Sequence, residues 1–134
     1  MTNHASGTFE VKLNPQPQEN NVGDRFVGRM SIDKQFHGDL EGTSMGQMLS
    51  VLGDAKGSAG YVAMERVVGT LHGHNGTFAL QHSGTMTRGN SHLTITVVSD
   101  SGTDQLVGLA GAMTINVVDG KHFYEFEYML DVAA

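Results

Sequence analysis

The sequence predicts an all-β protein, folded as a single eight-stranded antiparallel up-and-down β-barrel. Three observations predict this fold. Apolar and polar residues alternate along eight runs, which is the period of a half-buried strand. Short turn signals rich in Gly, Asn and Asp separate most of the runs, and no convincing helix lies between them. A barrel leaves no exposed strand edge, and a two-sheet β-sandwich is the alternative.

The first two predicted strands enclose a polar segment. Residues 1–5 are expected to be a disordered lead, and alternation begins with the run 6–13. The segment 14–23 contains both prolines, so we expect a loop that covers one end of the barrel. Alternation resumes over 24–36. The apolar sides of these two strands carry Phe9, Val11, Leu13, Phe26, Met30, Ile32 and Phe36.

The third predicted strand, 39–51, overlaps a segment that also fits a helix. Four apolar residues there have helical spacing, with Ser44 placed to cap the helix and Gly53 to end it. Strand is favoured to Val51, because Gly46 would cost a helix about 1 kcal/mol relative to alanine. The residues with helical spacing are Met45, Met48, Leu49 and Leu52. Earlier in the run, Asp39 and Glu41 are expected to be exposed or to pair with Lys34, and a carboxylate pair lining the cavity is the alternative.

The second half of the chain contains the remaining five strands. Turn signals at 53–58, 89–90, 100–105 and 119–120 separate them. Asn75-Gly76 is the strongest hairpin signal in the chain, and we place the central turn there. The predicted strands are 59–72, 77–88, 91–99, 106–118 and 121–130.

Length and composition limit the classes of function. The 134 residues suffice for one domain, expected over 6–132, that needs neither metal nor disulfide to be stable. A net charge of −6 without a basic cluster argues against nucleic acid. The sequence contains no long apolar run and no cysteine, so we predict a cytoplasmic protein without a membrane partner or a disulfide. Nucleotide-binding and hydrolase motifs are absent, and no cofactor is predicted.

The central hairpin, 60–86, holds the candidate catalytic residues. A two-residue or four-residue turn makes paired positions sum to an odd number, so odd positions on the first strand share a face with even positions on the second. Glu65 and His82 then lie on one face, within about one residue of being cross-strand neighbours. A carboxylate and an imidazole in an apolar interior are typical of general acid–base catalysis, and equally of a structural ion pair.

The same inward face, together with the last strand, supplies the predicted ligand-binding residues. Aromatic walls with hydroxyl groups and flexible methionines suit an apolar cavity, although they also suit plain core packing. The predicted ligand-binding residues are Tyr61, Phe78, Leu80, Met86, His122, Tyr124 and Tyr128. His72 and His74 have the spacing of a strand metal site, but they fall in a turn without a nearby acidic ligand, so we predict no metal.

Three segments resemble a known family. FHGDLEGTSMG at 36–46, the long stretch 57–86 and GKHFYEFEYML at 120–130 occur in order. Over residues 6–130 the chain resembles an uncharacterised bacterial family, domain of unknown function 3224. The resemblance implies a barrel similar to that of the plant allene oxide cyclases, which hold a lipid epoxide in a central cavity and form trimers. It therefore implies a homo-oligomer, dimer or trimer, but no established activity.

Three hypotheses for function follow. The leading one is a barrel that binds a largely apolar small molecule in its interior. The second is an isomerase or cyclase in which Glu65 and His82 move a proton. The third is a solidly packed barrel that acts through oligomeric or partner surfaces. An eight-stranded barrel permits all three, because its interior is just wide enough to be filled or to hold one small ligand.

Overall fold

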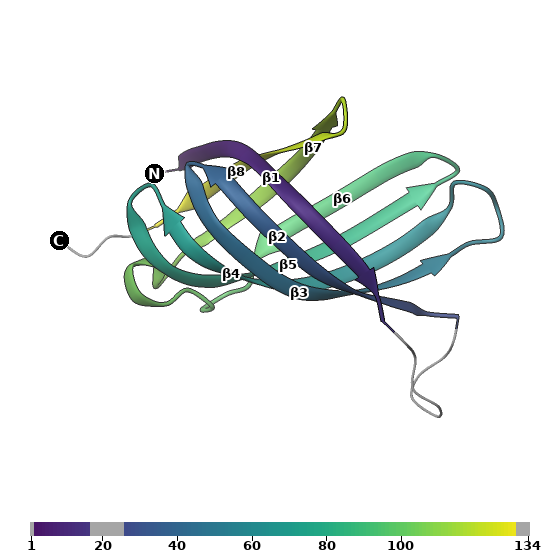
Figure 1. Ribbon diagram of the computed structural model, residues 1–134, viewed down its shortest axis with the longest axis horizontal. Coiled ribbons are helices and arrows are strands. Elements are labelled where there is room, and N and C mark those ends of the chain that lie inside the picture. Colours follow the sequence, from purple (N-terminus) through teal and green to yellow (C-terminus); the bar gives the residue numbers. More distant parts are fainter. Residues whose placement is uncertain (1, 17–25, 131–134) are drawn as a thin grey trace.

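A computed structural model describes residues 2–16 and 26–130 as a closed antiparallel barrel in which each strand pairs with its sequence neighbours and β1 pairs with β8 (Figure 1). The predicted fold class is confirmed, and the β-sandwich alternative is not. A 3₁₀ turn, η1, lies in the connection before β7. The elements are β1 (Asn3–Pro15), β2 (Gly28–Gly38), β3 (Leu40–Leu52), β4 (Ala59–Leu71), β5 (His74–Thr87), β6 (Asn90–Val97), η1 (Asp104–Leu106), β7 (Ala110–Val118) and β8 (Lys121–Met129).

Several predicted strand boundaries differ from the structure. The first strand begins at Asn3, so residues 3–5 are not a disordered lead: Ala5 pairs with Phe126 and is fully buried. The predicted strand at 106–118 begins only at Ala110, because the preceding loop folds against the barrel and buries Leu106 in the core. The end-covering loop predicted at 14–23 lies largely outside the described residues.

The apolar residues with helical spacing, from Met45 to Leu52, lie in the second half of β3. The strand favoured by the sequence is therefore confirmed. Glycines let this strand lie close to β4. Gly46 pairs with Glu65, and a Cβ at Gly46 would lie 2.1 Å from the carbonyl oxygen of Met64. A side chain there would clash with backbone that cannot move aside, so the glycine belongs to the strand pairing.

The central hairpin turns at a different position from the one predicted. The two-residue turn is His72-Gly73, where both residues have positive φ, 45° and 82°, as the primed hairpin turns require. Asn75 and Gly76 lie within β5. Because Leu71 pairs with His74, paired positions still sum to an odd number. The prediction that Glu65 and His82 share a face is therefore confirmed.

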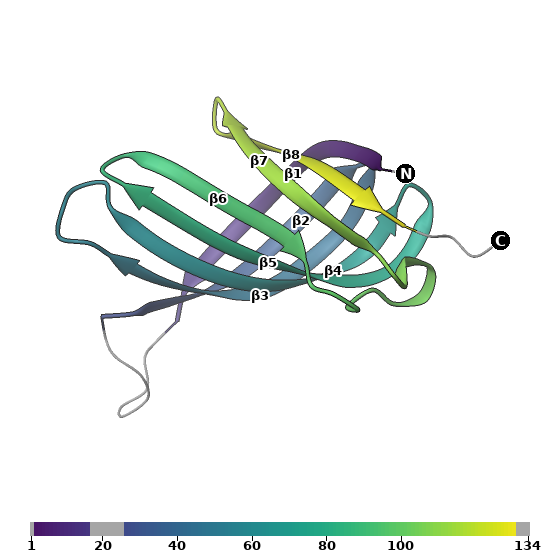
Figure 2. The ribbon, with the colours of Figure 1, turned by 180° about the vertical axis from the view of Figure 1, so that it is seen from behind.

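The barrel interior has a packed end and an open end. The packed end contains the core cluster and is covered by Leu106 and Leu109 from the loop before β7. β6 pairs with β7 only next to the packed end, through Ile95 with Met113 and Thr96 with Ala112, and no pairing joins the described residues of the two strands towards the open end. Figure 2 shows β6 and β7 diverging beyond these pairs. Within the described ranges, no helix has the length and apolar character needed to cross a membrane.

Candidate functional site

Four polar side chains from four neighbouring strands meet in the barrel interior. Lys34 on β2 and His82 on β5 both contact Oε2 of Glu65 on β4, with Nζ at 2.8 Å and Nε2 at 2.6 Å. Ser44 on β3 donates a hydrogen bond to Oε1 of Glu65 at 3.0 Å. All four residues are buried. We call Lys34, Ser44, Glu65 and His82 the ionic centre.

The pairing of the strands explains how these residues meet. Glu65 pairs with Leu80, and His82 pairs with Ala63, so the two side chains are diagonal neighbours on the inward face. β3 lies on the other side of β4, and its Ser44 is also a diagonal neighbour of Glu65 on the inward face. Lys34 pairs with Ser44 and reaches past this small side chain to the carboxylate. A larger residue at position 44 would separate Lys34 from Glu65.

The carboxyl group of Glu65 stays ionised down to a pH well below neutral. Burial favours its neutral form, but the hydrogen bond from His82 and the charge and hydrogen bond of Lys34 outweigh that effect and lower its pKa from 4.5 to about 2. An ionised carboxylate only accepts hydrogen bonds, so Nε2 of His82 must donate to it. The described residues offer Nδ1 of His82 no hydrogen-bond partner. The carboxylate thus orients the imidazole and holds its Nε2 as a hydrogen-bond donor.

Sequence reasoning missed Lys34 and Ser44. Of the two expectations for Asp39 and Glu41, exposure is confirmed and pairing with Lys34 is wrong. Lys34 points inward, with its Nζ 4.9 Å from the ring centre of Phe9. Asp39 and Glu41 are exposed and accept hydrogen bonds from the backbone N–H groups of Ser6 and Gly38. A signal for Lys34 was present, because it lies between Ile32 and Phe36 on the apolar side of its strand.

An apolar cavity of about 340 Å³ lies at the open end. Five consecutive strands, β3 to β7, line it, and Tyr61 and Met86 from the predicted ligand-binding set are among its residues. The ring of Tyr61 lies 6.5 Å from the ring of His82. Burial and the nearby charge of Glu65 raise the pKa of the Tyr61 hydroxyl. The other inward-facing lining residues are Met48, Ser50, Ala59, Gly84, Ser91, Leu93 and Ile115. We call this space the open-end cavity.

The remaining predicted ligand-binding residues lie elsewhere. Phe78, Leu80, Tyr124 and Tyr128 pack in the core cluster and do not line the open-end cavity. The hydroxyl of Tyr124 accepts a hydrogen bond from the backbone N–H of Leu40, and burial raises its pKa. His122 packs against the ring of Phe9 and lines a separate hollow between β1 and the β7–β8 turn. Of the seven predicted ligand-binding residues, only Tyr61 and Met86 line the open-end cavity.

His72 and His74 flank Gly73 at the packed end. His72 forms a hydrogen bond through Nδ1 with the hydroxyl of Tyr128, and its Nε2 lies 3.6 Å from the Asp39 carboxylate. Nδ1 of His74 is buried without a hydrogen-bond partner among the described residues. Among those residues no three His, Cys, Asp or Glu side chains are placed to hold a metal ion. His72 thus ties the hairpin turn to β8.

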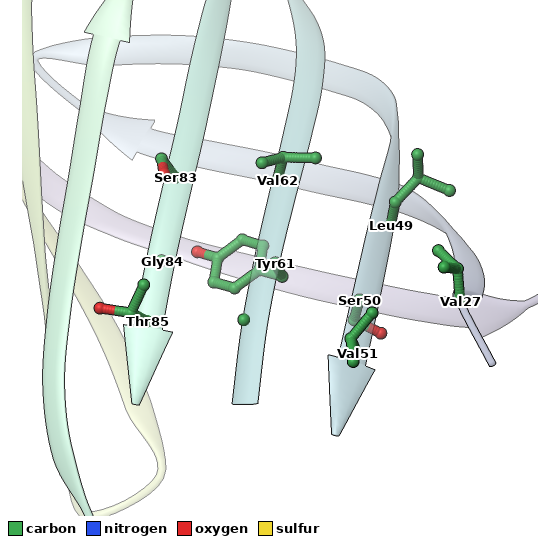
Figure 3. A pocket seen from close by; sticks show the side chains of 10 residues that line it. Val27, Leu49, Ser50, Val51, Tyr61, Val62, Ser83, Gly84 and Thr85 are labelled. Carbon is green, nitrogen blue, oxygen red and sulfur yellow. The ribbon is translucent and has the colours of Figure 1, made fainter. Parts of the chain in front are cut away.

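A second apolar hollow, of about 460 Å³, lies where β3, β4 and β5 approach the open end. Figure 3 shows Leu49 and Val62 on neighbouring strands at this hollow, and the ring of Tyr61 extending towards Gly84. A Cβ at Gly84 would lie only 2.2 Å from that ring. The missing side chain at Gly84 therefore makes room for Tyr61, which lines both hollows.

The fold and the site define a class: a small antiparallel β-barrel with a buried ionic centre below an apolar cavity. The chain belongs to the family described as protein of unknown function (DUF3224), whose model matches residues 5–128. It is similar to a crystal structure of a DUF3224 protein of unknown function from Shewanella oneidensis MR-1. The two are 47% identical, the match covers 99% of this chain and 100% of that chain, and the TM-score is 0.90. No curated protein matches the chain. The likeness to allene oxide cyclases stays a prediction.

Proposed function

We propose that this protein binds a largely apolar small molecule in the open-end cavity. The observation that carries the proposal is the position of Tyr61, which lines the cavity and also adjoins His82 of the ionic centre. A ligand in the cavity would have an apolar body against the barrel wall and one polar group directed towards the phenol and the imidazole. Small-molecule sites commonly combine an apolar lining with a few fixed polar groups.

The lining supports an apolar ligand of modest size. A volume of about 340 Å³ is near the lower end of the range for ligand pockets, roughly 300–1,000 Å³. Met48 and Met86 supply flexible, polarizable side chains that adapt to irregular apolar shapes. The hydroxyls of Ser50 and Ser91 are the small polar groups among them. We therefore expect a medium-length alkyl or terpenoid compound with a single oxygen function.

The short pairing of β6 with β7 supports a route of entry. Following the pairing of Ile95 with Met113, the next inward positions are Leu93 and Ile115, which line the cavity from its two sides. No backbone ladder joins the strands at these two residues. A ligand can therefore enter without breaking strand pairing, by displacing two apolar side chains.

Thermal unfolding with a panel of apolar probes tests the proposal. Decanol, decanoic acid, 2-decanone and geraniol are added in excess, and the melting temperature is recorded for each. A ligand that binds only the folded state raises that temperature. We expect at least one probe to raise it by several degrees. If none does so, the binding proposal loses its support.

A matched pair of variants locates the binding. Ile115→Trp places an indole in the open-end cavity and is expected to abolish the stabilisation by the probe. Val118→Trp changes an exposed aliphatic residue of the same strand and should leave the stabilisation unchanged. Equal loss in both variants, or in neither, would show that the probe binds somewhere else.

Proton transfer is a second candidate, favoured by one observation. The carboxylate of Glu65 fixes Nε2 of His82 as a donor, so Nδ1 is left without a partner among the described residues. Glu65 itself, with a pKa of about 2 and both oxygens hydrogen-bonded, is a weak proton acceptor. In this scheme His82 takes a proton from a carbon next to a carbonyl, and Glu65 stabilises the imidazolium that forms.

Deuterium exchange tests this second candidate without a known substrate. The protein is incubated with 2-decanone in D₂O, and deuterium at the carbons next to the carbonyl is measured by mass spectrometry. We expect faster exchange than in buffer, and loss of that acceleration in His82→Gln with probe binding retained. An acceleration that survives in His82→Gln would exclude His82 as the base.

A further inference from the structure

Five apolar side chains stand exposed on the outer wall of two adjacent strands. Met45 and Leu49 lie on β3, and Val62, Met64 and Val68 lie on β4, with exposed fractions between 46% and 68%. Leu49 and Val62 are directly paired, and the others occupy outward positions along the same two strands. We call this set the outer apolar face. Single exposed apolar residues are ordinary on a surface, but a contiguous group marks a site of contact.

Polar side chains border the outer apolar face on both sides, and two more, Gln47 and Arg66, lie within it opposite Met64 and Met45. On β2 the outward residues include Ser31, Asp33 and Gln35, and on β5 they include Gln81 and Ser83. An apolar centre with a polar rim is the composition of a protein–protein interface. Methionine, enriched at such centres, supplies two of the five residues. The apolar hollow that contains Leu49 and Val62 continues this surface towards the open end (Figure 3).

We propose that the outer apolar face is the contact surface between two copies of this chain, related by a two-fold axis that runs between β3 and β4. Such an axis places β3 of one copy against β4 of the other, so that the same patch serves both partners. Leu49 then meets Val62 of the second copy, and Gln47 meets Met64 of the second copy. Because a barrel wall is convex, the contact centres on two strands, which is the width of the outer apolar face.

Two charged residues, Arg66 within the face and Asp33 beside it, complement each other in this arrangement. Arg66, an outward residue of β4, donates from its guanidinium to the hydroxyl of Thr77, so its head group lies over β5. The two-fold axis places β2 of the second copy against β5. Asp33 of the second copy then opposes Ala79, the next outward residue after Thr77 along β5. The guanidinium of Arg66 can therefore reach the carboxylate of Asp33 of the second copy, and the two-fold symmetry makes this contact twice.

A second copy fits this face better than a lipid surface does. Membrane-surface proteins surround their apolar face with several lysines or arginines that attract anionic lipid. Among the described residues, the outward charged side chains within or next to the face are Arg29, Asp33, Glu41 and Arg66, a mixture of both signs. A self-complementary pattern of this kind needs only another copy of itself.

Sedimentation velocity of the full chain over a range of concentrations tests the proposal. We expect a monomer–dimer equilibrium in the wild-type protein. Met64→Glu places a charge in the contact and should raise the dissociation constant at least about 30-fold. Met129→Glu is the matched control, because Met129 is 51% exposed, against 49% for Met64, and lies on β8 in the opposite wall. It should leave the dissociation constant unchanged.

An exchange of charges tests the orientation of the two copies. Asp33→Arg and Arg66→Asp should each weaken the dimer, and the double variant should recover at least about threefold of the lost affinity. Circular dichroism confirms that each variant is folded. A wild-type protein that is monomeric at about 0.1 mM, a trimer, or a dimer insensitive to Met64→Glu would overturn the proposal. Failure of the double variant to recover affinity would overturn the two-fold arrangement.

Discussion

Glu65 and His82 meet inside the barrel at 2.6 Å, although they lie on different strands and neither pairs with the other in the backbone ladder. Lys34 contacts the same carboxylate from β2, which is separated from β4 by one strand around the barrel. The three side chains lie between the packed end and the open-end cavity. A charge at this depth affects both the stability of the barrel and the chemistry available to a bound ligand.

Removing the charge of Glu65 should strongly destabilise the protein. Glu65→Gln keeps the shape of the side chain but leaves the ammonium of Lys34 buried without a carboxylate. Breaking one side of a buried ion pair typically costs about 3–5 kcal/mol, and we expect a loss of that size in the free energy of unfolding by urea at pH 7. The double variant Lys34→Met/Glu65→Gln should lose less than Glu65→Gln alone. Equal losses would show that the two residues do not act as a pair.

Acid should remove the contribution of Glu65 in a defined range of pH. Its pKa is lowered from 4.5 to about 2 in the folded protein, so the unfolded chain takes up the proton first as the pH falls. The stabilisation is complete above pH 4.5 and is lost as the pH falls towards 2, and it amounts to about 3 kcal/mol. Urea unfolding of the wild type and Glu65→Gln at several pH values measures it. If the difference in stability between the wild type and Glu65→Gln stays constant between about pH 6 and about pH 2.5, the assignment is contradicted.

The glycine beneath Tyr61 should be intolerant of a methyl group. In Gly84→Ala the new Cβ would lie 2.2 Å from the tyrosine ring, so the ring must leave its place beside the open-end cavity. We expect a loss of about 1–3 kcal/mol in the free energy of unfolding. Gly60→Ala is the control, because a Cβ there meets nothing closer than an oxygen at 3.9 Å. In a Tyr61→Ala background, Gly84→Ala should cost no further stability.

Two buried tyrosines of β8 should differ in the importance of their hydroxyls. Tyr124→Phe leaves the buried N–H of Leu40 without its acceptor, which typically costs about 1–3 kcal/mol. Tyr128→Phe removes a hydrogen bond to His72, a half-exposed side chain that water can solvate instead, so we expect a loss of about 1 kcal/mol or less. Thermal unfolding of the two variants under one condition compares them. A larger loss for Tyr128→Phe would contradict this ranking.

Alternation along the chain by itself determined much of the architecture of this protein. The period of two in the runs around Phe9, Ile32 and Phe126 predicts strands, and the short turns between runs predict an antiparallel barrel. The same period placed Glu65 and His82 on one face. That prediction held although the hairpin turn lies at His72-Gly73, because a shift in the position of a two-residue turn leaves the odd-and-even rule unchanged.

Which inward residues meet was decided only by the tertiary structure. Lys34 contacts Glu65 because the pairing of β2, β3 and β4 sets them side by side across the small Ser44. Leu106 is core rather than strand because a loop folds back over the end of the barrel. Tyr124 is in the packed end and Tyr61 at the cavity, although both are inward aromatics. Alternation is local and assigns a face, whereas depth in the barrel and contact partners depend on strand register and closure, which join residues far apart in the chain.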